Sequence, residues 1–320
     1  MAQKIVGQLG FVDQLTRGVG RKSGEVLEQI SALVDWPALE ALMSGFYPSQ
    51  TGEKAFPPLL MFKVLLLQAW HGLSDPEMEA SLDDRMSFRR FAGFSVDDRV
   101  PDHATIWRFR QRLVERKLDQ VLLAEVTRQL DARGLVVKRG TLIDASLTQS
   151  AARRPTMNEG KTSKIDAEAR FGTNNERGRF TFGYKMHMAM DEGSALVRAA
   201  VMTSANIQEI DLAQSLVQGD EKTVYADRGY DSSRLHDHLE ALGINNGVMR
   251  RGAKTAPAIQ ERNNAISAIR RNIEKLFGTQ KRHYGLGRMR YFTQARNAMR
   301  MVFCVIGYNL KRMRVISQPT

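Results

Sequence analysis

The sequence predicts an α/β protein in which a helical N-terminal domain, residues 1–132, precedes a mixed-sheet domain, residues 133–320. Two observations carry this prediction. The first 130 residues contain apolar segments of helical length with capping signals. From Leu135 onward the pattern changes to short apolar or alternating runs, which are typical of strands. With 320 residues and 42% hydrophobic content, the chain can bury the core of one large domain or of two ordinary ones.

The N-terminal helices are predicted from segment length and from their first residues. The longest apolar run, residues 57–70, has the length of a buried helix. The segment 74–77, Ser-Asp-Pro-Glu, has the form of a capping box, and Asp102 is placed to cap a helix over residues 104–117. We therefore expect several short helices in succession.

A helix-turn-helix pair is a further expectation for this domain. Residues 81–91 would form its first helix, Gly93 its turn, and the helix after Pro101 its second member. The second helix carries Arg108 and Arg112, which are candidate DNA contacts. Arginines on an amphipathic helix often face solvent without such a role, so both interpretations stay open.

The mixed-sheet domain is predicted from the order of its segments. Residues 135–147 indicate a buried strand, and residues 180–190 alternate between apolar and polar side chains, as in a half-exposed strand. The remaining segments are a hairpin turn at 191–194, a strand at 195–202, a helix at 207–217, a strand at 222–226, a helix at 232–242, a strand at 247–249, and helices at 259–277 and 294–314. This is the ribonuclease H-like order.

The segment 149–179 has few large apolar residues and mixes Arg and Lys with Asn, Gly, Thr and Ser. Such a composition cannot support a core. The sequence therefore predicts a mobile basic loop that becomes ordered against DNA.

Positive charge is concentrated near the C-terminus. The net charge is +12, yet residues 251–320 alone contain fifteen Lys and Arg against Glu261 and Glu274. A charge run is often only a solvated face, but this many uncompensated positive charges would repel each other unless a polyanion neutralised them. The sequence thus indicates double-stranded DNA as partner, with these candidate phosphate contacts in the basic C-terminal segment: Lys281, Arg282, Arg288 and Arg290.

Several protein classes are excluded by the composition. Residues 57–70 are shorter than a bilayer span and are interrupted by Lys63 and Gln68, so no membrane is implied. The N-terminus lacks the apolar stretch of an exported protein, and a cytoplasmic, nucleoid-associated location is expected. The single cysteine, Cys304, excludes an intramolecular disulfide and a thiolate zinc site.

Three acidic residues are the candidate catalytic group. Asp144 lies in an otherwise apolar strand, where a carboxylate is costly unless something compensates it. Asp227 ends a strand just before a glycine turn, a common place for functional groups. Glu274 follows Arg270 by one helical turn and sits next to Ile273, at the edge of the buried face, from which it could lean over the strand ends.

Carboxylates in such a cluster are the ligands that Mg²⁺ and Mn²⁺ prefer. Two such ions roughly 4 Å apart stabilise the attacking and leaving oxygens of a phosphodiester, so Asp144, Asp227 and Glu274 are expected to hold two ions. The competing interpretation is structural: Asp144 caps a turn, Asp227 pairs with Arg228 or Tyr230, and Glu274 pairs with Arg270 on the surface. Three rival acids are interpreted as turn or cap residues: Asp191, Asp220 and Asp231.

Lys185 and His187 share the polar face of the predicted half-exposed strand. We expect both to contact DNA near the scissile bond rather than to bind metal, because a histidine beside a cationic lysine is a poor ligand. On pattern alone, exposed strand residues without a role are an equal alternative.

Motifs along nearly the whole chain resemble those of one family. The N-terminal blocks are residues 46–48, 57–70, 73–76, 89–93 and 101–106, and the later blocks are GTLIDA at 140–145, FGYKMH at 182–187, TSAN at 203–206 and YADRGY at 225–230. In this order they resemble the DDE transposases of bacterial insertion sequences, in the group typified by insertion sequence five. The family's third motif is matched by Arg270, Glu274 and Lys281, whereas Ser267 stands where a tyrosine is expected.

This resemblance implies a ribonuclease H-like fold and cut-and-paste transposition. The implied steps are binding of terminal inverted repeats, strand cleavage by water, and attack of a 3′-hydroxyl on target DNA. It also implies a homodimer or higher oligomer on DNA, with Arg228 and Arg270 as contacts beside the acids. Two alternatives stay open: a catalytically inactive, repurposed DNA-binding protein, and a ribonuclease H-like nuclease specific for DNA structure.

Overall fold

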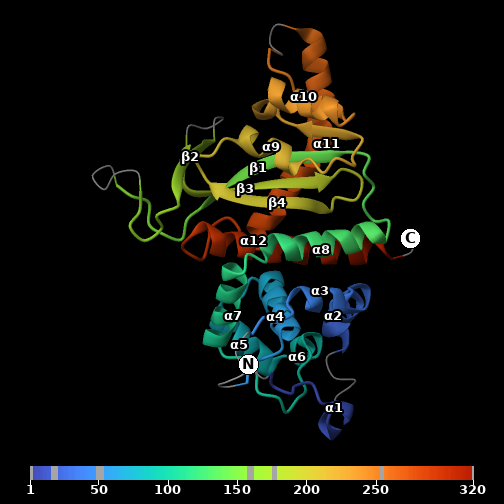
Figure 1. Cartoon of the computed structure of the whole chain (residues 1–320), viewed down its shortest axis with the longest axis vertical. Coiled ribbons are helices and arrows are strands. Elements are labelled where there is room, and N and C mark those ends of the chain that lie inside the picture. The colour runs from blue at the N-terminus through green and yellow to red at the C-terminus, as the bar shows by residue number, and fades with distance from the viewer. Residues whose placement is uncertain are drawn as a thin grey trace. The chain divides into compact units, whose positions relative to one another are not determined.

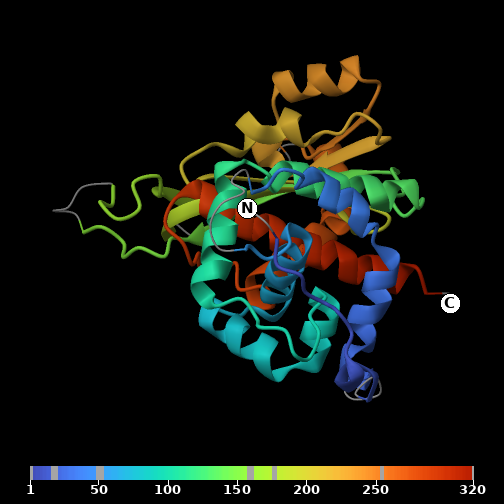
Figure 2. The same ribbon diagram turned by 60° about the horizontal axis from the view of Figure 1, so that its bottom comes forward.

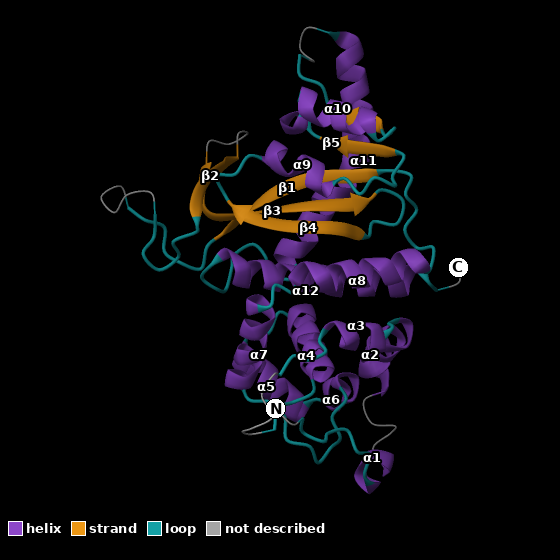
Figure 3. Cartoon of the chain, in the orientation of Figure 1, coloured by secondary structure: helices purple, strands orange, loops and turns teal. Residues whose placement is uncertain are grey.

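The computed structural model describes residues 3–15, 21–47, 54–156, 162–174, 179–252 and 256–318. The chain forms two compact units, one of Met1–Gln129 with Ile306–Thr320 and the other of Leu130–Val305. Figures 1 and 2 show the ribbon from two directions, and Figure 3 separates helices from strands. The described strands all lie in the second unit, so the predicted α/β class with a helical N-terminal part is confirmed.

The first unit is built around helix α4, Pro58–His71. Eight of its large apolar side chains are buried and cover every side of the helix, which is expected for a helix at the centre of a bundle. Contacts join α4 to four of the surrounding helices, α3, α5, α6 and α7. The helices of this unit are α1 Phe11–Leu15, α2 Arg21–Leu33, α3 Trp36–Leu42, α4, α5 Asp75–Asp84, α6 Met86–Ala92, α7 His103–Glu115, most of α8 Asp119–Ala132, and the C-terminal part of α12 Gln294–Ile316.

Both predicted helix caps are present. Ser74 Oγ accepts a hydrogen bond from the Glu77 amide, and the Glu77 carboxylate accepts one from the Ser74 amide at 2.7 Å, which completes the capping box of α5. Asp102 accepts from the Thr105 amide at 2.6 Å at the start of α7. Local sequence therefore determines where these two helices begin.

The expected helix-turn-helix pair is wrong in its geometry. Residues 81–91 do not form one helix, because Arg85 has an extended backbone between α5 and α6. Ten residues separate α6 from α7, whereas the turn in such motifs has three or four. Arg89 fixes this connection by donating to the carbonyls of Val96 and Asp98 at 2.9 and 2.8 Å.

The second unit contains a mixed sheet in the strand order β2-β3-β1-β5-β6, with β4 also paired to β3. The pairs β1–β3 and β3–β4 are antiparallel, and the pairs β1–β5 and β5–β6 are parallel. This arrangement confirms the predicted ribonuclease H-like order. The strands are β1 Thr141–Gln149, β2 Arg170–Asn174, β3 Arg179–Asp191, β4 Val197–Ser204, β5 Thr223–Ala226 and β6 Asn245–Val248.

Helices cover both faces of this sheet. The core on one face joins side chains of β1, β3, β5 and β6 to those of α9 Glu209–Leu216 and α10 Ser233–Ala241. Helix α11, Pro257–Arg282, contacts β1 and β5 and lies on the other side of the strands from α9 (Figure 3). The N-terminal part of α12 completes the unit. No helix among the described residues is long and apolar enough to cross a membrane.

The first predicted strand was placed too early, because β1 begins at Thr141 rather than near Leu135. The preceding residues take part in a turn held by Asp191, whose carboxylate accepts from the amides of Val137 and Lys138. Asp191 is thus a turn residue, as expected.

Strand β3 is not half-exposed as its alternation indicated. Residues 182–191 are all buried, although their side chains alternate between the two faces. The reason is that β3 is an inner strand, flanked by β1 on one side and by β2 and β4 on the other, with helices on both faces. Polar side chains at Lys185 and His187 are therefore enclosed rather than presented to solvent.

The described part of the predicted basic loop is more ordered than its composition indicated. Its residues 170–174 form β2, which pairs with β3. Asp166 is fully buried and accepts hydrogen bonds from Ser150 Oγ, Tyr184 Oη and the Thr293 amide. One buried carboxylate thus replaces the missing apolar anchors. Residues 157–161 and 175–178 lie outside the described residues, so mobility of this segment stays a prediction.

Candidate functional site

Asp144 and Asp227 come together because their strands are neighbours. In the parallel pair β1–β5, Leu142 lies opposite Tyr225, so the residues two positions further along each chain are adjacent. Asp144 lies within β1, and Asp227 follows β5 directly at the start of the short 3-10 helix η2, Arg228–Tyr230. The Asp227 carboxylate accepts from the Gly229 amide at 2.8 Å. The two carboxylates thus lie side by side on neighbouring inner strands of the sheet.

A third carboxylate, Glu209, joins them from the first residue of α9. One oxygen from each of Asp144, Glu209 and Asp227 lies within 4.8 Å of the other two, and all three side chains are half-buried. Sequence reasoning missed Glu209. An acid in the first turn of a helix is favoured there by the helix dipole anyway, so its position alone carried no functional signal. Its only distinguishing feature was its place three residues after the TSAN block.

Glu274 is not part of this group. It lies on α11 with an exposed side chain, among residues that the structure describes. Its predicted neighbour Arg270 points elsewhere, with Nη2 at 3.1 Å from Asp144 Oδ2 and both side chains largely buried. Arg270 therefore pairs with Asp144, and not with Glu274 as in the structural alternative. A catalytic role for Glu274 stays a prediction.

Burial dominates the electrostatics of the group. Burial raises the pKa of Asp144 to about 7; the Arg270 guanidinium opposes this rise and the Asp227 carboxylate adds to it. Burial likewise raises the pKa of Glu209, while Lys185 acts to lower it. The group contains three acids, Asp144, Glu209 and Asp227, and two neighbouring cations, so one acid has no cationic partner of its own within it.

Two further observations indicate that the group fits a divalent cation. Tyr230 Oη is fully buried and has no hydrogen-bond partner among the described residues. Burial, and then the carboxylates of Asp144, Glu209 and Asp227, raise the pKa of this phenol well above its usual value. A Cβ at Gly229 would lie 2.9 Å from Asp227 Oδ1, so glycine keeps this position open. Hard oxygen donors in an incompletely neutralised pocket are what Mg²⁺ or Mn²⁺ requires.

Lys185 and His187 lie on the face of β3 that α9 covers. Lys185 Nζ donates to the Ile207 carbonyl at 2.9 Å and lies 3.3 Å from Glu209 Oε1. His187 is fully buried, and its Nε2 is 2.8 Å from Thr203 Oγ1. Burial, with Lys185 nearby, lowers the pKa of His187 to about 4, so the ring is neutral at pH 7. Direct DNA contact by either residue stays a prediction, and it requires access that this structure does not provide.

The other candidate DNA contacts of the second unit are mostly exposed. Arg228, Arg282, Arg288 and Arg290 are exposed, and Lys281 is half-buried. Several arginines donate to backbone carbonyls: Arg262 to those of Val248 and Asn246, Arg300 to that of Gly285, and the exposed Arg282 and Arg288 to those of Gly278 and Ala151. Arg270 in addition pairs with the Asp144 carboxylate, so the expectation that the C-terminal positive charge is wholly uncompensated was wrong.

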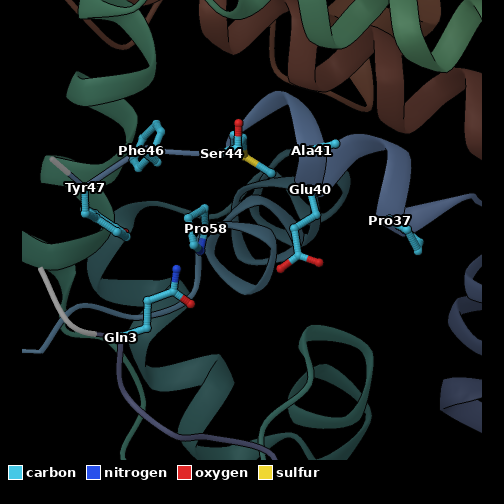
Figure 4. A pocket seen from close by; sticks show the side chains of 10 residues that line it. Gln3, Pro37, Glu40, Ala41, Ser44, Phe46, Tyr47 and Pro58 are labelled. Atoms are coloured by element: carbon cyan, nitrogen blue, oxygen red, sulfur yellow. The ribbon is translucent and has the colours of Figure 1, made fainter.

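Arg108 and Arg112 line a pocket of the first unit with a volume of about 340 Å³. Two further cations, Lys4 and Lys54, line the same pocket, and the Arg112 guanidinium stacks 5.0 Å from the centre of the Tyr47 ring. A neighbouring pocket of about 380 Å³ has a different character, since its lining residues include Glu40 and no lysine or arginine (Figure 4). Of these two pockets, only the first suits an anion such as a phosphate.

Comparison with known proteins gives two family matches. The sequence profile of a family described as transposase DDE domain matches residues 137–310, and that of a family described as transposase domain matches residues 19–112. Among solved structures, the piggyBac transposase synaptic complex with hairpin DNA is 11% identical with a TM-score of 0.45, covering 95% of this chain and 77% of that one. A pre-cleavage Mos1 transpososome is also 11% identical with a TM-score of 0.20, covering 79% of this chain and 95% of that one.

Proposed function

This chain belongs to the transposase DDE domain family, and on that premise we propose that it excises an insertion sequence at its terminal inverted repeats and joins the ends to target DNA. The predicted resemblance to DDE transposases of bacterial insertion sequences is confirmed by the family matches, and the chain is a DNA-cleaving transposase. The observation that best supports the finer proposal is the convergence of the Asp144 and Asp227 carboxylates, whose oxygens lie within 4.8 Å of each other.

The two proposed reactions are phosphoryl transfers at the same site. In the first, water attacks the phosphorus at the element end, the P–O3′ bond breaks, and a 3′-hydroxyl and a 5′-phosphate result. In the second, that 3′-hydroxyl attacks a phosphodiester of the target, and the target's own 3′-oxygen leaves and takes up a proton. One bond forms and one breaks in each reaction, so no oxidant or energy source is needed.

Asp144 and Asp227 are the residues that would hold Mg²⁺ or Mn²⁺, with Glu274 as the predicted third acid. Such a cation stabilises the negative charge that develops on the phosphate oxygens when the ion is bound. Arg270 keeps the Asp144 carboxylate oriented through its 3.1 Å contact. The identity and number of the ions remain part of the proposal, with two expected.

DNA is the proposed partner, contacted through the exposed cations of the second unit and through the pocket of Arg108 and Arg112 in the first. A phosphate in that pocket would sit among four cationic side chains, and such contacts position DNA without reading its sequence. A homodimer or higher oligomer is expected in the complex, since two element ends must be joined.

The experiment that tests this function compares three DNA substrates. The purified protein is incubated with Mn²⁺ and a duplex carrying the inverted repeat that flanks its gene, a scrambled duplex, or a four-way junction. We expect cleavage at the repeat boundary only. Preferential cleavage of the junction would support the structure-specific nuclease instead. Specific binding to the repeat without cleavage, with Mn²⁺ and also with Mg²⁺, would support the inactive DNA-binding protein.

A further inference from the structure

We propose that Glu209 is a further carboxylate ligand of the divalent cation at this site, in addition to Asp144 and Asp227. This inference rests on the proposed function, because it presumes that the site binds a cation. It assigns a role to a residue outside the three acids that the sequence indicated. It also explains why the third carboxylate beside Asp144 and Asp227 is that of Glu209 and not that of Glu274.

The two oxygens of Glu209 have different surroundings. Oε1 lies 3.3 Å from Lys185 Nζ, and that ammonium group is itself fixed by the Ile207 carbonyl at 2.9 Å. Oε2 faces the loop after β5, where a Cβ at Gly229 would lie 3.6 Å from it and 2.9 Å from Asp227 Oδ1. Oε1 therefore forms the ion pair with Lys185, and Oε2 borders the space beside Gly229 that Asp227 also borders.

An unpartnered buried group supports this assignment independently of the acids. Tyr230 Oη, which is fully buried, lacks a hydrogen-bond partner among the described residues, although polar atoms so deeply buried usually have one. Tyr230 follows Gly229 in η2, which contacts α9, the helix that begins with Glu209. The Tyr230 hydroxyl is therefore suited to form a hydrogen bond with a ligand that the three carboxylates hold.

A purely structural role accounts for less of what is observed. As a first-turn acid, Glu209 would gain from the helix dipole and from Lys185 without approaching other carboxylates. Its oxygen instead lies within 4.8 Å of those of Asp144 and Asp227, where like charges repel. A bound cation reverses the sign of that interaction, so the arrangement becomes favourable only with metal present.

The test measures Mn²⁺ binding to the full-length protein without DNA, by electron paramagnetic resonance of the free ion. Glu209→Gln keeps the shape of the side chain and removes its charge. Asp211→Asn is the matched control, because Asp211 is an exposed acid two residues further along the same helix. We expect Glu209→Gln to weaken Mn²⁺ binding at least roughly tenfold, the loss typical even for residues that only orient ligands. Asp211→Asn should bind as the parent does.

A third variant, Asp144→Asn, separates this inference from the proposed function. If Asp144→Asn loses Mn²⁺ affinity and Glu209→Gln retains it, Glu209 is not a ligand and the proposed function stands. If both variants bind Mn²⁺ like the parent, the metal site itself is wrong. Should Glu209→Gln fail to fold, the parent is loaded with Fe²⁺ and treated with hydrogen peroxide and ascorbate. Fe²⁺ reduces the peroxide to hydroxyl radicals, which cut the backbone next to the ion, and ascorbate reduces the Fe³⁺ formed. Cuts near residues 144 and 227 without any near 209 would overturn the inference.

Discussion

At the scale of single residues, substitution of Asp227 is the most direct way to distinguish a functional carboxylate from a structural one. Its carboxylate accepts a hydrogen bond from the Gly229 amide, which the side-chain oxygen of an asparagine can accept equally well. Because Asp144 and Glu209 lie close by, the charge of Asp227 is a source of repulsion in the metal-free protein. Functional carboxylates crowded together commonly lower stability in this way.

We therefore expect Asp227→Asn to leave the melting temperature in chelator unchanged or to raise it slightly. The measurement is a thermal melt in EDTA, repeated with Mn²⁺, where the parent should be stabilised more than the variant because it binds the ion more tightly. Asp166→Asn is a useful contrast, since Asp166 is a structural carboxylate with three donors. A large loss of melting temperature for Asp227→Asn would show that its role is structural.

His187 gives the protein a pH dependence. Its folded-state pKa of about 4 lies below the ordinary histidine value of 6.5, because burial and Lys185 disfavour the charged ring. The unfolded chain therefore binds the proton first as the pH falls. The stabilisation is complete above about pH 6.5 and is lost as the pH falls toward 4, by roughly 3 kcal/mol at most.

Replacing His187 with glutamine removes this titration. Urea unfolding between pH 7 and pH 5 should then show a smaller loss of stability for His187→Gln than for the parent. His283→Gln serves as control, because His283 is exposed, and it should follow the parent. Identical pH profiles for the parent and His187→Gln would mean that the ring is not held neutral.

At the scale of elements, the sequence predicts regular segments well where local signals decide them. The caps at Ser74 and Asp102 act through adjacent residues, so they can be read from the chain. The exposure of β3 depends on which strands and helices surround it, and its period of two is the same whether one face or both are covered. Lys185 was misplaced for that reason. Glu209 was missed because only the packing of α9 brings it to Asp144.

The segment 149–179 shows the opposite error, since composition alone underestimated its order. Its described part depends on Asp166, a buried carboxylate that accepts from Ser150, Tyr184 and Thr293. Removing the acceptor leaves several buried donors unsatisfied, each costing about 1 kcal/mol or more. Asp166→Ala should accordingly lower the free energy of unfolding by about 3 kcal/mol in urea titrations.

Lys164→Ala is the control for that substitution, because Lys164 is exposed in the same segment. It should unfold like the parent. An Asp166→Ala protein of unchanged stability would mean that this segment does not pack against β3 as described.

At the scale of the whole molecule, we expect the distribution of exposed positive charge to determine the affinity for DNA. Among Lys281, Arg282, Arg288 and Arg290 the three arginines are exposed, and Arg282 and Arg288 also donate to carbonyls, as the less exposed Arg262 and Arg300 do. Neutralising the first four should reduce the slope of log affinity against log salt by up to about four, at roughly 0.9 per lost contact. Arg139→Ala is the control, since Arg139 is exposed but paired with Glu192. An unchanged slope would remove these residues from the interface.

Asp144 and Asp227 are expected to act as one metal-holding unit in DNA cleavage. The most direct measurement is the rate of Mg²⁺- or Mn²⁺-dependent nicking at the cognate repeat by Asp144→Asn, Asp227→Asn and the double variant, with repeat binding measured in parallel. We predict that each single amide lowers the rate by at least about a hundredfold while binding persists, and that the double variant is little slower than either single. Nicking at the parental rate by Asp144→Asn or Asp227→Asn would show that the substituted residue is not part of a metal-holding unit.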